Sequence, residues 1–109
     1  MPRLDLYINY ELQATVKLDQ PEIRIGRDPA CEVQLPDERV SRLHAIISPT
    51  QQGHEIEDCS TNGIKINGVK VEGTQTLNPG DAVFIQSHIL MYQSDEAPTE
   101  GMAATMLAD

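Results

Sequence analysis

The chain has no tryptophan, one phenylalanine and three tyrosines among its 109 residues. Basic residues are also few, because eight Lys and Arg stand against seventeen Asp and Glu and leave a net charge of −9. Nucleic acids and anionic membranes both attract basic surfaces, so this composition argues against non-specific binding to either. The length fits a single domain with one hydrophobic core.

Long hydrophobic runs and cysteines are equally scarce. No apolar run exceeds four residues, which excludes a transmembrane helix. The first nine residues include Asp5 and lack an apolar signal core, so we expect no secretory peptide. Cys31 and Cys59 do not make a disulfide framework, and they indicate reduced thiols in a cytoplasmic protein.

The residues that are present favour strands. Ile and Val together number sixteen against nine Leu, and branching at Cβ favours β-structure. Apolar residues alternate with period two, and no segment sustains a period of 3.6. The pattern predicts about eleven short strands, at 4–8, 12–18, 23–25, 33–35, 43–47, 55–57, 64–66, 69–71, 75–77, 82–86 and 89–93. Turn signals separate them, the strongest being Asn67-Gly68, and such a pattern is typical of a sandwich or barrel.

The strand pattern ends near Gln93, which predicts a domain over residues 1–93 and a flexible acidic tail over residues 94–109. The tail has four acidic residues and no basic ones. Such a composition favours disorder.

Donors suited to a phosphate stand at a few points between the predicted strands. Arg27 follows Gly26 at a strand end, Arg42 follows Ser41, and 60–63 reads Ser-Thr-Asn-Gly. Arginine offers a planar fork of donors, hydroxyls offer short hydrogen bonds, and a glycine frees nearby backbone N–H groups. The same residue types are common in solvated turns, so composition alone leaves both readings open.

The order of the motifs decides between these readings. The chain resembles the forkhead-associated (FHA) domain family, a phosphothreonine-binding module, over roughly residues 3–93. The matching segments, in order, are 25–27 (Ile-Gly-Arg), 31–37, 41–44 (Ser-Arg-Leu-His), 58–63, 67–68 and 77–81. The resemblance implies an all-β fold, an eleven-stranded antiparallel β-sandwich with ligand loops at one end.

The resemblance also implies a role for each matching loop residue. Arg27 corresponds to the arginine that grips the phosphate, and Ser41 to the serine that donates its hydroxyl. Arg42 corresponds to a second phosphate contact. Thr61 corresponds to a residue that helps bind phosphate, and Asn62 to the asparagine that holds the peptide main chain.

A second group of residues is expected to support these loops. Gly26 would allow a tight approach of two chain segments, and His44 would brace the recognition loop through hydrogen bonds. Gly63 would free the amides of its turn, and Asn67 with Gly68 would form a hairpin turn.

Catalysis and metal binding are weaker readings of the same residues. Ser41, His44 and Asp58 form a hydrolytic triad on paper, yet no G-x-S-x-G turn exposes the serine. The cysteines and histidines show no C-x-x-C or H-x-x-x-H spacing. We therefore expect a non-catalytic module without cofactor or metal.

The expected function is recognition of phosphothreonine in a partner protein, downstream of a Ser/Thr kinase. Two alternatives remain: a phospho-independent interaction domain, and the N-terminal regulatory domain of a larger protein. The module is expected to be a monomer. Thr99 and Thr105 in the tail are possible phosphoacceptors, and their phosphorylation would permit tail-mediated self-association between molecules.

Overall fold

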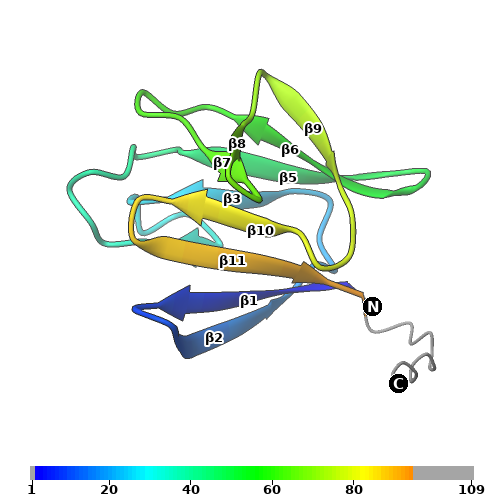
Figure 1. Ribbon diagram of the computed structural model, residues 1–109, viewed down its shortest axis with the longest axis horizontal. Helices are drawn as coiled ribbons and strands as arrows, with labels where there is room; N and C mark the ends of the chain where they lie inside the picture. Colours follow the sequence, from blue (N-terminus) through cyan, green and yellow to red (C-terminus); the bar gives the residue numbers. More distant parts are fainter. Residues whose placement is uncertain (1, 95–109) are drawn as a thin grey trace.

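The computed structural model describes residues 2–94, and within them the chain forms eleven strands and no helix (Figure 1). The predicted number of strands is therefore confirmed. The strands are β1 (Arg3–Ile8), β2 (Glu11–Lys17), β3 (Ile23–Gly26), β4 (Val33–Gln34), β5 (Ala45–Thr50), β6 (Gly53–Asp58), β7 (Lys65–Ile66), β8 (Val69–Lys70), β9 (Thr74–Leu77), β10 (Ala82–Ile85) and β11 (His88–Gln93). The predicted tail, with Thr99 and Thr105, lies outside the described residues apart from Ser94.

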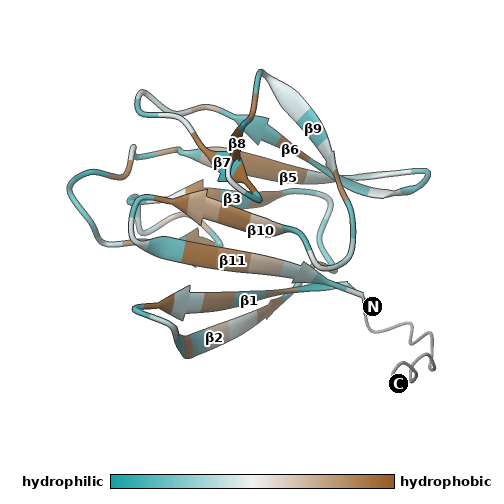
Figure 2. Cartoon of the chain, viewed as in Figure 1, coloured by the Kyte–Doolittle hydropathy of each residue, from teal (hydrophilic) through white to brown (hydrophobic). Residues whose placement is uncertain are grey.

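Two sheets make up the sandwich. The six-stranded sheet has the order β2-β1-β11-β10-β7-β8, and the five-stranded sheet has the order β4-β3-β5-β6-β9. The core between them consists of aliphatic side chains, among which Leu4, Ile25, Ile56 and Leu90 are fully buried. Burial alternates along β11, where His88, Leu90 and Tyr92 are the buried residues, and both β10 and β11 carry brown stretches in Figure 2. Because one face of each sheet packs on the other sheet, alternate positions are buried.

One buried polar contact joins the two sheets. His54 on β6 is 6% exposed and Tyr92 on β11 is 3% exposed. The His54 Nδ1 atom lies 2.9 Å from the Tyr92 hydroxyl, and the rings meet edge to face with centroids 5.6 Å apart. A buried polar pair of this kind stabilises only if its hydrogen bond is made, as it is here.

The pairing is antiparallel throughout, with one exception. Strand β4 pairs with β3 in parallel, with Ile25 opposite Val33. This pair departs from the purely antiparallel sandwich that the sequence led us to expect. A parallel pair requires the connecting loop to return to the start of the first strand. Here the loop at 27–32 only has to return from Gly26 to a point beside Ile25, because β4 has two residues and pairs with the last two residues of β3.

Asn67 and Gly68 form the predicted two-residue hairpin turn, between β7 and β8. Both residues have positive φ, 52° and 86°, as a type I′ turn requires. The Asn67 side chain also accepts a hydrogen bond from the Ala82 amide at 3.0 Å and donates one to Asp81 at 3.0 Å. The turn is thereby fixed to the start of β10.

The loops that carry the five predicted phosphopeptide contacts gather at one end of the sandwich. They follow β3, β4 and β6, on the left in Figure 1. The opposite end holds the start of β1 and the end of β11, where Arg3 pairs with Gln93. Among residues 2–94 there is no helix of the length and apolarity that a membrane crossing needs.

Candidate functional site

A hollow of about 300 Å³ opens between the loops at that end. Its lining consists of Arg27, Glu38, Arg39, Val40, Ser41, Arg42, Thr61 and Asn62. All five residues for which the sequence predicted phosphopeptide contact therefore lie together, although they come from three separate loops. Strands β4, β3, β5 and β6 are successive neighbours in the five-stranded sheet, and their pairing brings the loops at their ends to one place.

Arg27 stands at the start of the loop that follows β3. Its Nε donates to the Val40 carbonyl at 3.0 Å, and its backbone amide donates to the Ser41 carbonyl at 3.0 Å. These bonds fix the guanidinium at the hollow without using its two terminal nitrogens, which make no hydrogen bond to the described residues. Two parallel donors of this kind suit the oxygens of a phosphate.

Ser41 connects two of the loops. Its hydroxyl oxygen accepts a hydrogen bond from the Thr61 amide at 3.2 Å. Because the oxygen acts there as an acceptor, the hydroxyl hydrogen remains available to an anion in the hollow. Thr61 itself is exposed and lines the same hollow.

Asn62 connects the loop after β6 to the loop before β5. Its Nδ2 donates to the Arg39 carbonyl at 3.0 Å, which orients the amide at the rim. The second Nδ2 hydrogen and the amide oxygen are left for a ligand, and a peptide backbone offers complementary groups to both. Arg42, the fifth residue, is exposed beside them.

Gly26 is required for space rather than for its backbone angles. A Cβ atom built on this residue would lie 2.1 Å from the Arg42 carbonyl oxygen and 3.0 Å from the Ser41 carbonyl oxygen. Its φ lies outside the positive range that favours glycine. The loop with Ser41 and Arg42 therefore rests directly on the Gly26 backbone, as the tight approach expected from the sequence requires.

His44 is fully buried beneath the loops and bonds to two of them. Its Nδ1 accepts from the Ser41 amide at 3.0 Å, so Nε2 carries the hydrogen and donates to the Gly63 carbonyl at 3.1 Å. Both ring nitrogens are thus used on backbone groups. The Asp58 carboxylate accepts from the Ser60 amide at 2.9 Å, away from the ring. This arrangement does not form a Ser-His-Asp triad.

The turn at 60–63 is closed by its own side chains. The Gly63 amide donates to the Ser60 hydroxyl at 2.7 Å, and Gly63 has a φ of +88°. A residue with a Cβ is strained at that angle, which explains the glycine at this position. The closed turn presents Thr61 and Asn62 outward.

Arg39 is a lining residue to which the sequence reading gave no role. Its guanidinium forms a two-point salt bridge with Asp37, with Nη2 2.8 Å from Oδ2 and Nε 3.1 Å from Oδ1, and Nη2 also donates to the Ser87 hydroxyl at 2.8 Å. The arginine lowers the pKa of Asp37 to about 2. The short spacing of Asp37 and Arg39 in the sequence could have predicted their salt bridge. The contact with Ser87 could not be predicted in this way, because it joins residues 48 positions apart.

The thiols take no part in the hollow. Burial raises the pKa of both Cys31 and Cys59, which disfavours the reactive thiolate. Residues 2–94 contain no group of three or more His, Cys, Asp or Glu side chains placed to hold a metal ion.

This geometry can be compared with known proteins. The family model of the FHA domain matches residues 23–85, which contain every residue that lines the 300 Å³ hollow. The chain belongs to the FHA domain family. In this FHA domain the five predicted phosphopeptide contacts lie on loops at one end of the sandwich, as the resemblance implies.

Two curated relatives from mycobacteria match part of their own length. The ABC transporter ATP-binding/permease protein Rv1747 of Mycobacterium tuberculosis is 37% identical over 79 residues, which are 72% of this chain and 9% of that protein. The transcriptional regulatory protein EmbR of Mycobacterium bovis is 34% identical over 85 residues, which are 77% of this chain and 20% of that protein. The chain therefore spans a small fraction of each relative.

Solved structures show the same fold. The FHA domain of the CT664 protein from Chlamydia trachomatis has a TM-score of 0.78 at 27% identity, over 85% of this chain and 96% of that one. The FhaA FHA domain, complexed with the intracellular domain of Rv3910, has a TM-score of 0.76 at 28% identity, over 85% of this chain and all of that one. Mycobacterium tuberculosis EmbR in complex with a low-affinity phosphopeptide has a TM-score of 0.75 at 29% identity, over 84% of this chain and 24% of that one.

Proposed function

We propose that this FHA domain is a non-catalytic module that binds phosphothreonine in an extended segment of a partner protein. The observation that carries the proposal is the hollow between the loops, where Arg27, Ser41 and Asn62 present free donors within one small space. A solved relative that binds a phosphopeptide supports the same reading.

The chemistry of a phosphate fits this arrangement. A phosphorylated threonine carries nearly two negative charges and three acceptor oxygens. A charge-assisted hydrogen bond contributes about 1.5–3 kcal/mol net. Three or four such bonds, reduced by the ordering of the peptide and the loss of rigid-body freedom, give a complex of about −8 kcal/mol, in the micromolar range.

The proposed function includes an upstream Ser/Thr kinase that makes the ligand, and a domain that acts as a monomer in the cytoplasm. Glu38 on the rim of the hollow, together with the acidic surface elsewhere, disfavours nucleic acids and leaves specificity to the local cluster of arginines.

A degenerate peptide library with a fixed phosphothreonine, compared with the same library carrying threonine, tests this function. We expect the domain to retain only phosphorylated peptides. The Arg27→Ala variant loses the two free guanidinium nitrogens and should bind a selected peptide about 2–4 kcal/mol more weakly by calorimetry.

Lys17 provides a matched control, because it is an exposed cation on β2 outside the hollow. Lys17→Ala removes the same charge and should leave the affinity within about twofold. Equal retention of both libraries, or an Arg27→Ala variant that binds as tightly as the unmodified domain, would contradict phosphothreonine recognition.

A further inference from the structure

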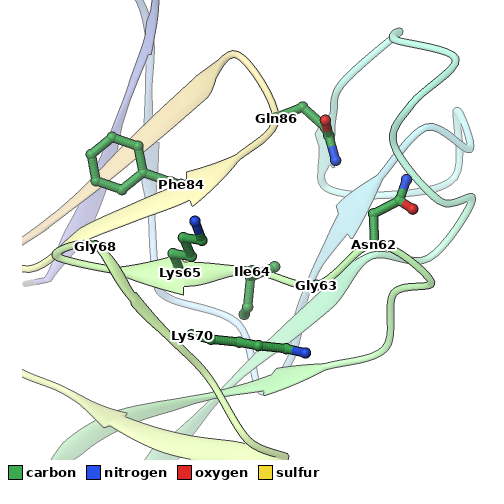
Figure 3. Close-up of a pocket in the computed structure, with 8 residues that line it drawn as sticks. All are labelled: Asn62, Gly63, Ile64, Lys65, Gly68, Lys70, Phe84 and Gln86. Carbon is green, nitrogen blue, oxygen red and sulfur yellow. The ribbon is translucent and has the colours of Figure 1, made fainter.

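A second hollow, of about 460 Å³, adjoins the first and shares Asn62 with it. Figure 3 shows Lys65 and Lys70 between Phe84 on one side and Asn62 with Gln86 on the other. Gly63, Ile64 and Gly68 complete the lining, which contains no acidic residue. The second hollow is therefore cationic, with one aromatic wall.

The two lysines occupy an unfavourable pairing position. Strands β7 and β8 have two residues each, and Lys65 lies directly opposite Lys70 in their register. Like charges directly opposite each other on paired strands destabilise the pair. No salt bridge joins either lysine to a carboxylate of residues 2–94. The repulsion between the two lysines is therefore not compensated in the free domain, and such an uncompensated unfavourable pair indicates a role in binding.

Lys70 also lies against the loop that carries Asn62. A Cβ built on Gly63 would lie 3.7 Å from the Lys70 Cε, so the lysine side chain runs along this glycine. Phe84, 36% exposed, is opposite Lys65 in the pairing of β10 with β7. The hollow thus offers an apolar surface for methylene groups and two ammonium groups for an anion.

The distribution of charge over the domain supports the same conclusion. Three of the eight basic side chains pair with carboxylates: Arg3 with Asp5, Arg24 with Glu32 and Arg39 with Asp37. The other five are Lys17, Arg27, Arg42, Lys65 and Lys70. Four of these five line the two hollows that meet at Asn62, in a chain with more than twice as many acidic as basic residues.

We propose that the second hollow binds another anionic group, a carboxylate or a second phosphate, on the same peptide that places its phosphothreonine in the first. The inference rests on the proposed function. One peptide is favoured because Asn62 lines both hollows, and joined groups bind with a high effective concentration. The partner segment is then an acidic or multiply phosphorylated sequence around the phosphothreonine.

A positional scan tests this specificity. The reference probe is an alanine-flanked phosphothreonine peptide, and two series move one glutamate or one phosphoserine through the flanking positions. We expect a gain of about two- to fivefold for glutamate at one or two adjacent positions, and a larger gain for phosphoserine there. The gain should disappear in the double variant Lys65→Gln/Lys70→Gln and persist in Lys17→Gln.

The free domain gives a second readout. Removing either lysine relieves the repulsion, so Lys65→Gln and Lys70→Gln should each raise Tm by about 1–5 °C. The double variant should add little to either single change, because the repulsion needs both lysines. A variant that is more stable and yet binds the acidic peptide more weakly cannot be explained by damage to the fold.

The outcomes separate the two proposals. If the reference peptide binds and no flanking position depends on the two lysines, the second site is overturned. The lysines would then serve to keep the edge strand β8 from pairing with other chains, and the double variant would show self-association by light scattering. If the reference peptide does not bind, phosphothreonine recognition itself fails, and the second site fails with it.

Discussion

Substituting Gly26 by alanine tests how the phosphate loop is held. The added Cβ would lie 2.1 Å from the Arg42 carbonyl oxygen, and since real Cβ contacts stay above 3.0 Å, the loop must move by at least 0.9 Å. That oxygen accepts a hydrogen bond from the Asp28 amide at 3.2 Å, which such a movement would break. Overpacking and the lost bond together should cost about 2–4 kcal/mol, a fall in Tm of about 10 °C or more.

The same movement should carry Ser41 away from the phosphate position. Loss of its charge-assisted hydrogen bond predicts a fall in phosphopeptide affinity of about tenfold or more in the folded fraction. Thermal unfolding followed by circular dichroism measures the stability, and calorimetry well below Tm measures the binding.

Gly80→Ala is the matched control, because Gly80 has a φ of +93° and no atom within 4 Å of a built Cβ. It lies in the turn before β10, and it should lose about 1–2 kcal/mol of stability to backbone strain and no affinity. A Gly26→Ala domain with unchanged Tm and unchanged affinity would refute the close approach described here. Loss of affinity in Gly80→Ala as well would show that reduced stability alone weakens binding.

Two further variants probe the buried histidines. His44→Ala removes the acceptor for the Ser41 amide and the donor for the Gly63 carbonyl, and it leaves a cavity. The free energy of unfolding, measured with denaturant, should therefore fall by about 2–4 kcal/mol, and an unchanged midpoint would contradict the bracing role. Burial lowers the pKa of His54 below 6.5, so the unfolded chain takes up a proton that the folded domain resists. Stability should therefore fall as the pH drops through and below 6.5. The His54→Phe variant loses the bond to Tyr92, so it should be less stable at neutral pH, and its stability should change less steeply with pH. An unchanged dependence of stability on pH would contradict this origin.

Much of the fold followed from local patterns. Alternating apolar residues predicted the strands because side chains of a strand point to opposite faces, and one face of each sheet must be buried. Asn67-Gly68 predicted its hairpin because both residues adopt positive φ at little cost. The resemblance to the FHA family selected the loop residues, and the structure brought Arg27, Ser41 and Asn62 into one hollow.

The contacts within the site depended on the pairing of strands in the five-stranded sheet. The bond between Ser41 and Thr61 joins residues 20 positions apart, and that between Asn62 and Arg39 joins residues 23 apart. Local conformational preference cannot determine such contacts, because they exist only when two loops are brought together by strands that pair elsewhere.

The lysine pair illustrates the same division between sequence and tertiary structure. The sequence by itself determined that Lys65 and Lys70 flank a tight turn, since the Asn-Gly dipeptide and the apolar residues beside it are local features. Only the tertiary structure decided that the two ammonium groups share a hollow with Phe84 and Asn62, because β10 and the loop after β6 must first pack around the hairpin. Backbone angles depend mainly on each residue and its neighbours in the sequence, whereas a charged hollow forms only where distant segments meet.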